Sequence, residues 1–185
     1  MYVAIELPLP VLHDIERAIA PLRTTSPDLA WTDTHQRHIT MKFLGSLEAD
    51  RAERLAPMMD GVARAHRPFA LHLSRVGAFP NFRKARVVWL GVEEEPRFEL
   101  LQHDLELAAE GVGFEIEGRA FRPHVSLARI GAPLDVEHVR TFARAARKVD
   151  FTAAVNVAEM TLFESTLAPD GARYRRIHAA TLGGR

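Results

Sequence analysis

The chain has 185 residues, of which 47% are apolar, a length and composition suited to one substantial domain with its own core. Its 24 basic and 24 acidic residues balance to a formal charge of zero, which argues against a protein that coats nucleic acid through a large basic surface. The chain has no cysteine, so disulfides, thiolate metal sites and a cysteine nucleophile are excluded.

The first twelve residues, MYVAIELPLPVL, are apolar but contain Glu6, Pro8 and Pro10. A secretory signal peptide would begin with basic residues and continue with an unbroken apolar run, and a membrane span would need about 20 apolar residues. The sequence contains neither pattern. We therefore expect a cytoplasmic protein that has no membrane partner.

Hydrophobic periodicity predicts alternating strands and helices along the chain. Strands are expected at residues 1–7, 38–44, 69–76, 85–92, 124–130, 151–164 (one long strand or a pair) and 173–181, and helices at 8–23, 50–65, 96–110 and 135–147. The order strand, helix, strand, strand that begins at residue 38 recurs from residue 124, which indicates an internal duplication. We expect an α+β fold in which residues 1–185 form a single bilobal domain, with a first unit at about 31–92 and a second at about 121–181.

The first strand of each unit carries the same polar pattern. HITMKFLG begins at His38 and has Thr40 two residues later, and HVSLARIG begins at His124 and has Ser126 two residues later. Side chains two residues apart on a strand lie on the same face. If a pseudo-two-fold axis relates the units, two imidazoles and two hydroxyls face each other across a shared cleft.

This set of side chains suits phosphodiester chemistry. Imidazole has an unperturbed pKa near ~6.5, so one histidine can act as a general base while the other acts as a general acid. The hydroxyls of Thr40 and Ser126 can donate hydrogen bonds to phosphate oxygens as charge develops on them. The scheme needs no metal or other cofactor, and the spacing leaves open which histidine is the acid.

A zinc site is the competing interpretation, because histidine is a frequent zinc ligand. The sequence contains no His-Glu-x-x-His pair and no cysteine. The spacing of His35 and His38 sends their side chains to opposite faces of an extended segment. We therefore predict that the protein binds no metal.

Strict alternation also assigns the neighbouring side chains to faces of the strand. Lys42 shares the face of His38 and Thr40, which predicts either a cation in the cleft that binds substrate or a surface salt bridge. Phe43 falls on the opposite face, which predicts a core position for its ring.

The two motifs and the segments around them resemble a known family. WTDTHQRHITMKFLG at 31–45 is similar to the first signature of the 2H phosphoesterase superfamily, and FRPHVSLARI at 121–130 is similar to the second, with Ser126 where threonine is commoner. The opening VAIELP, GAFPNFRKARVVWLGV at 77–92 and LFESTLAPDGARYRRI at 162–177 resemble one branch, the RNA 2′,3′-cyclic phosphodiesterases, also called 2′-5′ RNA ligase-like proteins. The resemblance covers nearly the whole chain, although MYVAI lacks the arginine common in the family's first strand.

The resemblance implies two antiparallel β-sheets related by a pseudo-two-fold axis, with helices packed outside and a central cleft. It implies hydrolysis of RNA 2′,3′-cyclic phosphate ends, or of small cyclic nucleotides, to 2′-phosphomonoesters without a metal or cofactor. By carry-over, His38 is the proton donor to the leaving O3′ and His124 is the proton acceptor that activates water, while Thr40 and Ser126 hold the phosphate oxygens. Arg129 matches a family arginine linked to the phosphate or nucleotide, although alternation puts it opposite His124 unless a bulge or the strand end re-aims it.

Other functions remain open beside the hydrolysis of RNA ends. The same two-histidine site suits another cyclic phosphate, such as one on ADP-ribose, or the cleavage or joining of 2′-5′ linkages. A non-catalytic module that binds RNA ends would keep the cleft without transferring protons.

Three cations gather in FRKAR at 82–86, in a loop before a predicted strand. They either hold RNA backbone upstream of the cyclic end or belong to a solvated hairpin. No obligate protein partner is indicated by the sequence, and we expect a monomer.

Overall fold

Strands and helices alternate along the chain in the order that the periodicity predicts. The structure, a computed structural model, describes residues 1–46, 49–132, 134–168 and 171–183. Its elements are β1 (Tyr2–Glu6), α1 (Leu9–Thr25), β2 (Ala30–Trp31), the 3-10 turn η1 (Thr34–Gln36), β3 (His38–Phe43), α2 (Ala49–Ala65), β4 (Phe69–Phe79), the 3-10 turn η2 (Phe82–Lys84), β5 (Val87–Val92), α3 (Pro96–Gly111), β6 (His124–Arg129), α4 (Val136–Ala146), β7 (Thr152–Val157), β8 (Glu159–Ala168) and β9 (Gly171–Thr181). The region predicted as one long strand or a pair is the pair β7 and β8.

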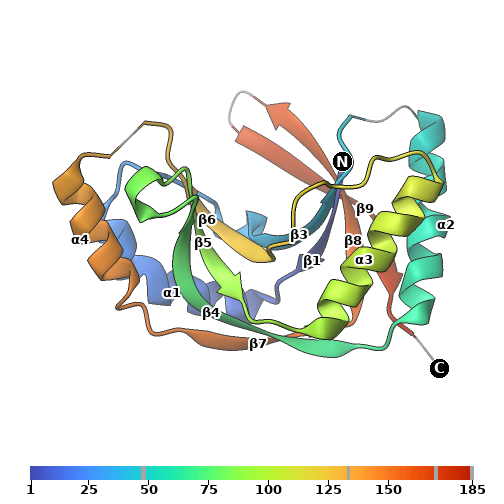
Figure 1. Cartoon of the computed structure of the whole chain (residues 1–185), viewed down its shortest axis with the longest axis horizontal. Helices are drawn as coiled ribbons and strands as arrows, with labels where there is room; N and C mark the ends of the chain where they lie inside the picture. The colour runs from blue at the N-terminus through green and yellow to red at the C-terminus, as the bar shows by residue number, and fades with distance from the viewer. Residues whose placement is uncertain (47–48, 133, 169–170, 184–185) are drawn as a thin grey trace.

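The strands form one hydrogen-bonded path in the order β7-β4-β5-β6-β3-β1-β8-β9, and the short β2 pairs with β6. At the centre of this path, β3 and β6 are antiparallel and are joined by a single described pair, Ile39 with Val125. On either side of that seam the sheet forms two halves, with α1 and α4 over one half and α2 and α3 over the other (Figure 1). The predicted bilobal α+β fold is confirmed, with its two antiparallel sheets joined edge to edge.

Each half of the sheet takes strands from both of the predicted sequence units. β4 and β5, from the first unit, lie beside β6 and β7 from the second, while β1 pairs on one side with β3 from the first unit and on the other with β8 from the second. A strand with no neighbour exposes unpaired backbone groups, so neither unit could complete its half alone. We propose on this ground that the chain folds as a single domain.

The helices cover the sheet through narrow apolar stripes. In α1 the four buried residues are spaced three or four apart, as one face of a helix requires, and they are Leu12, Ile15, Ile19 and Leu22. None of the helices in the described part of the chain is long and apolar enough to cross a membrane.

A one-residue bulge interrupts both central strands at the same place. In β3 the extra residue is Met41, which stands between two residues paired to β1, and in β6 it is Leu127, which stands between two residues paired to β5. Each bulge lies three residues after the histidine of its strand. A bulge reverses the alternation of side chains beyond it. Along each of the two strands, the exposure of successive residues is therefore intermediate, buried, intermediate, buried, buried and exposed.

The bulge in β3 changes the position of Lys42. Beyond Met41 the faces of the strand are exchanged, so Lys42 lies on the core face and is only 4% exposed. Its ammonium pairs with Glu106 of α3 and donates to the backbone oxygen of Glu115 at 2.9 Å. The prediction that Lys42 binds substrate in the cleft is therefore wrong, because strict alternation makes no allowance for the extra residue.

We expect Glu106→Ala to lower the free energy of unfolding by about 3–5 kcal/mol, because it leaves a buried ammonium without its carboxylate. Urea unfolding would measure this loss. The double variant Lys42→Met/Glu106→Leu should recover most of it, since an apolar pair of similar size often replaces a buried ion pair at little cost.

Arg175→Ala, which breaks an exposed pair with Glu164, is the control and should change stability little. Equal losses in Glu106→Ala and Arg175→Ala would contradict the role assigned to burial.

Candidate active site

A cleft with a volume of about 810 Å³ lies over the seam between β3 and β6. It is lined by Met1, Tyr2, Ala30, Thr32, Gln36, Arg37, His38, Thr40, Phe43, Gly45, Ser46, Val87, His124, Ser126, Arg129, Ser165 and Tyr174. The structure thus brings together all the predicted site residues except Lys42. No Asp or Glu occurs among the described residues that line the cleft, so its polar groups suit an anion.

The pairing register explains why the two motifs meet. The residue pair that joins β3 to β6 is wholly buried, and side chains on either side of a paired residue point to the opposite face of the sheet. His38, Thr40, His124 and Ser126 are these flanking residues, so all four emerge on the cleft face. The antiparallel direction sets His38 toward Ser126 and Thr40 toward His124, so each histidine lies beside the hydroxyl of the other motif.

Both imidazoles are held by the same hydrogen bond. Nδ1 of His38 lies 2.8 Å from the backbone oxygen of Gln36, and Nδ1 of His124 lies 2.7 Å from that of Arg122. A carbonyl oxygen only accepts, so Nδ1 carries the proton in both rings and Nε2 remains for proton exchange. Each bond reaches two residues back along the same chain, so no second side chain is needed to orient either ring.

Aromatic rings enclose His38. Tyr2 stacks on the imidazole with ring centres 4.7 Å apart, and Tyr174 packs edge-on with ring centres 5.9 Å apart. Burial lowers the pKa of His38 below its ordinary value, although the hydrogen bond to Gln36 and the carboxylate of Glu6 partly oppose the change. The free imidazole is therefore held in its neutral form more firmly than an exposed one.

His124 is perturbed in the same direction. Phe79 packs edge-on against it with ring centres 5.0 Å apart. Burial lowers the pKa of His124, and the guanidinium of Arg129 lowers it further, while the hydrogen bond to Arg122 acts in the opposite direction. A phosphate bound between the two rings would favour the charged form of each.

The matching bulges bring Phe43 and Arg129 to matching places. Each stands two residues beyond the bulge of its strand, and both line the cleft. Because the strands are antiparallel, the two side chains lie at opposite ends of the seam. Phe43 is 67% exposed, so its predicted core position is wrong, for the same reason as with Lys42. For Arg129 the structure contains the bulge, which is one of the two arrangements that would turn it toward the cleft.

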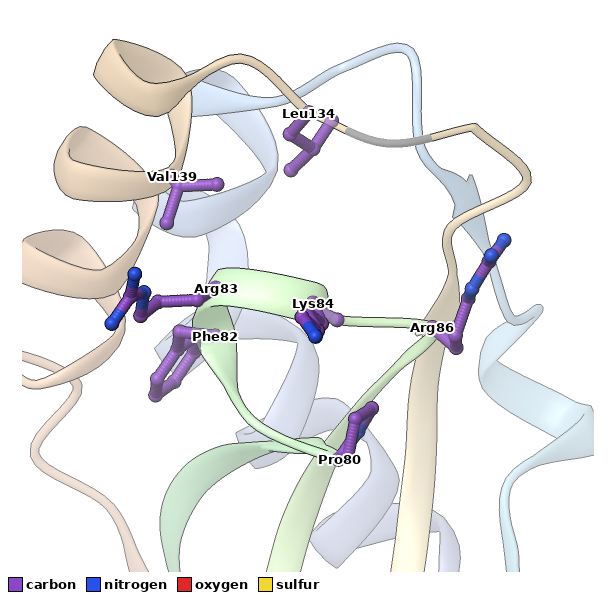
Figure 2. Close-up of a pocket in the computed structure, with 8 residues that line it drawn as sticks. Pro80, Phe82, Arg83, Lys84, Arg86, Leu134 and Val139 are labelled. Atoms are coloured by element: carbon purple, nitrogen blue, oxygen red, sulfur yellow. The ribbon is translucent and has the colours of Figure 1, made fainter.

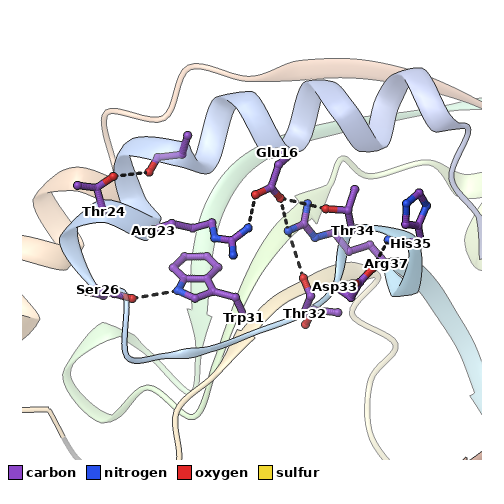
Figure 3. A network of polar contacts seen from close by, with 11 residues as sticks. Glu16, Arg23, Thr24, Ser26, Trp31, Thr32, Asp33, Thr34, His35 and Arg37 are labelled. Carbon is purple, nitrogen blue, oxygen red and sulfur yellow. Dashed lines mark hydrogen bonds and ion pairs between the residues drawn. The ribbon is translucent and has the colours of Figure 1, made fainter. Parts of the chain in front are cut away.

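Tyr2, Tyr174 and Arg37 line the cleft without having been predicted from the sequence. The Arg37 side chain has no exposed surface and pairs with Glu16 of α1 at 2.7 Å (Figure 3). Its Nε and Nη1 have no hydrogen-bond partner among the described residues. Glu16, 21 positions earlier in the sequence, thus holds the positive charge of Arg37 in the cleft wall. A contact between residues so far apart is not indicated by any local sequence pattern.

The described residues contain no group of three or more His, Cys, Asp or Glu side chains placed to hold a metal ion. The donors that line the cleft include hydroxyls, two imidazoles and the guanidiniums of Arg37 and Arg129, which are groups that bind phosphate oxygens.

Comparison with known proteins fits this geometry. Residues 11–168 match the profile of the 2′-5′ RNA ligase superfamily. The chain belongs to that superfamily. A relative from Methanothermobacter thermautotrophicus named RNA 2′,3′-cyclic phosphodiesterase is 27% identical over 173 residues, which cover 94% of this chain and 93% of the relative. The predicted resemblance to the 2H phosphoesterases is confirmed.

Two solved structures share the whole arrangement. TT0787 of Thermus thermophilus is 27% identical, superposes with a TM-score of 0.83, and the match covers 100% of this chain and 98% of that one. E. coli LigT complexed with 3′-AMP is 26% identical with a TM-score of 0.76, over 98% and 96% of the two chains. The matches include both halves of the sheet and therefore the seam between them.

We expect His38 and His124 in the free protein to titrate below the ordinary histidine value of ~6.5, because burial disfavours the charged form of both. Tyr2→Leu should move the pKa of His38 upward, since it opens to water the ring face that Tyr2 covers, and should leave His124 unchanged. NMR titration of the ring nitrogens would measure both values. Equal shifts in the two rings would show that stacking by Tyr2 is not the source of the burial.

Proposed function

We propose that this protein hydrolyses RNA 2′,3′-cyclic phosphate ends to 2′-phosphomonoesters by two-histidine acid-base catalysis, without a metal. One observation carries the proposal. Two imidazoles on facing strands share the same tautomer and lie beside hydroxyl donors in a cleft that no described carboxylate lines. The superfamily assignment and the name of the Methanothermobacter relative support the same substrate class.

In this proposal His124 is the base and His38 is the acid. Nε2 of neutral His124 takes a proton from water as the water oxygen bonds to phosphorus. The bond between phosphorus and O3′ breaks, and Nε2–H of protonated His38 gives its proton to O3′. The phosphate stays on O2′, and one water is consumed for each ring opened.

The charges near the rings favour this assignment over its reverse. The carboxylate of Glu6 raises the pKa of His38, which favours the protonated acid form against the burial of that ring. The guanidinium of Arg129 lowers the pKa of His124, which favours the neutral base form. The family resemblance assigns the roles in the same way.

The remaining cleft donors stabilise charge on the phosphate. Hydroxyls of Thr40 and Ser126 would donate to the non-bridging oxygens, and each lies across the seam from the histidine of the other strand. Arg129 adds a full positive charge at one end of the cleft. Donors already fixed on strands need little reorganisation as the charge develops, which is where such groups lower the barrier.

We expect His38→Ala and His124→Ala each to lower kcat by about 10²–10⁴-fold, because each removes one proton transfer. The double variant should be scarcely slower than either single variant, since the two groups act as a unit. The assay is phosphorus NMR of a short RNA with a 2′,3′-cyclic phosphate end, in EDTA.

His13→Ala, which removes an exposed histidine of α1 that does not line the cleft, is the matched control. Retained rates in either site variant would contradict the two-histidine scheme. A 3′-phosphate product would reverse the leaving group, and loss of activity in EDTA would contradict metal independence.

We expect a bell-shaped dependence of kcat/KM on pH, centred below ~6.5, because the pKa values of both histidines are lowered in the free protein. Rates should fall at low pH as the base becomes protonated, and at high pH as the acid loses its proton. The profile of kcat should extend to higher pH, since bound phosphate favours the imidazolium. A flat profile between pH 5 and 8 would contradict histidine as the titrating group.

The joining or cleavage of 2′-5′ linkages is a second candidate, which the superfamily assignment favours. The same acid and base would serve if a 5′-hydroxyl took the place of water. Adding a 5′-hydroxyl RNA to the assay above separates the two, because joining yields a longer chain and hydrolysis does not.

A further inference from the structure

A second concavity lies beside the cleft, between η2 and α4. It consists of two adjoining hollows of about 300 Å³ and 710 Å³ that share Arg83, Lys84, Leu134 and Val139. We call it the basic groove and define it by the cations Arg83, Lys84, Arg86 and Arg140 together with the apolar Phe82 and Leu134. Figure 2 shows Arg83 extending toward α4 and Arg86 on the opposite side of the loop.

The cations of the basic groove have no carboxylate partner among the described residues. Its four cations are exposed, and none forms an ion pair with a described residue. No acidic residue lines either hollow in the described part of the chain. Some exposed arginines elsewhere do have carboxylate partners, as Arg97 has Glu95 and Arg175 has Glu164. The groove therefore attracts anions in a chain whose formal charge is zero.

The floor of the basic groove is apolar and fixed. Phe82 packs against Phe142 of α4 with ring centres 6.2 Å apart, which holds the η2 turn on the helix. Pro80, Leu134 and Val139 complete this surface. An apolar floor under a cationic rim is the combination with which proteins bind single-stranded nucleic acid, whose bases and sugars pack while its phosphates pair.

The basic groove continues directly from the cleft. Val87 lines the cleft and pairs with Arg129, and the preceding residue, Arg86, accepts a hydrogen bond from the Ile130 amide at 2.9 Å. From Val87 to Lys84 the chain spans at most about 11 Å. Cations therefore follow one another from the end of the cleft into the groove.

We propose that the basic groove binds the sugar-phosphate backbone of RNA on the 5′ side of the nucleotide that reacts in the cleft. The proposal rests on the proposed function, and it names the substrate as the end of a polynucleotide rather than a free cyclic nucleotide. A 2′,3′-cyclic phosphate belongs to the 3′-terminal nucleotide, so the rest of the RNA leaves the cleft on its 5′ side. Arg129 and then Arg86 lie where that chain would pass.

The test compares two substrates and two triple variants. Arg83→Gln/Lys84→Gln/Arg140→Gln neutralises the groove, and Arg54→Gln/Arg64→Gln/Arg67→Gln removes the same charge from exposed residues of α2 and its C-terminal end. The substrates are 2′,3′-cyclic AMP and a short single-stranded RNA with a 2′,3′-cyclic end.

For the RNA, we expect kcat/KM of the groove variant to be lower by roughly tenfold or more. Its kcat/KM should also depend less steeply on salt, with the size of the negative slope of log kcat/KM against log salt reduced by about 2. The α2 variant should behave as the wild type with both substrates, and 2′,3′-cyclic AMP should be turned over at similar rates by all three proteins. An unchanged rate with RNA in the groove variant would overturn the proposal, as would equal losses with both substrates.

A binding measurement separates failure of this proposal from failure of the proposed function. If the wild type opens neither cyclic phosphate, the proposed function fails, and fluorescence anisotropy of the same RNA carrying a 5′ label then decides the role of the groove. Weaker binding in the groove variant but not in the α2 variant supports the groove as an RNA site. Equal binding by all three proteins overturns it.

Discussion

The site depends on the way β3 and β6 meet at one residue pair. Ile39 and Val125 are buried opposite each other, so the residues that flank them must all turn to the other face. That constraint brings two histidines and two hydroxyls together although they come from separate parts of the chain. The two sheet halves meet at this seam, so the same contact that joins them also assembles the cleft.

The period-two pattern was sufficient to predict the part of the site nearest that pair. The four residues of the two motifs stand before the bulges, where alternation holds, and the cleft contains all of them. Beyond Met41 and Leu127 the prediction fails for Lys42 and Phe43, because an extra residue has no signature in a sequence of apolar side chains. Hydrophobic periodicity predicts the order of strands and helices. It does not predict that each half of the sheet combines strands from both sequence units, because strand pairing between distant segments leaves no local pattern.

Buried charge is the other feature that local patterns miss. Lys42 and Glu106 link β3 to α3, and the backbone amide of Glu117 also donates to Glu106 at 3.2 Å. The segment after α3 leads to His124, so this ion pair fixes the approach to the second motif from the core side. Arg37 has the equivalent position at the first motif, because it directly precedes His38 and its side chain pairs with Glu16 of α1. Charged side chains that a local sequence pattern would assign to solvent or substrate thus hold the two central strands, β3 and β6, in place.

The two bulges also bear on which way round a substrate lies. Up to the bulge the seam is nearly the same when read from either strand, with histidine, apolar residue, hydroxyl, apolar residue, and with each imidazole bonded to the carbonyl two residues before it. A site with that repetition offers an asymmetric ligand two almost equivalent orientations. The repetition ends beyond the bulges, where the side chains that line the cleft differ: β3 carries the phenyl ring of Phe43 and β6 the guanidinium of Arg129. In the proposed reaction, the polarity of the bound RNA is therefore set at the two ends of the seam, and the two histidines at its centre take their different roles from that polarity.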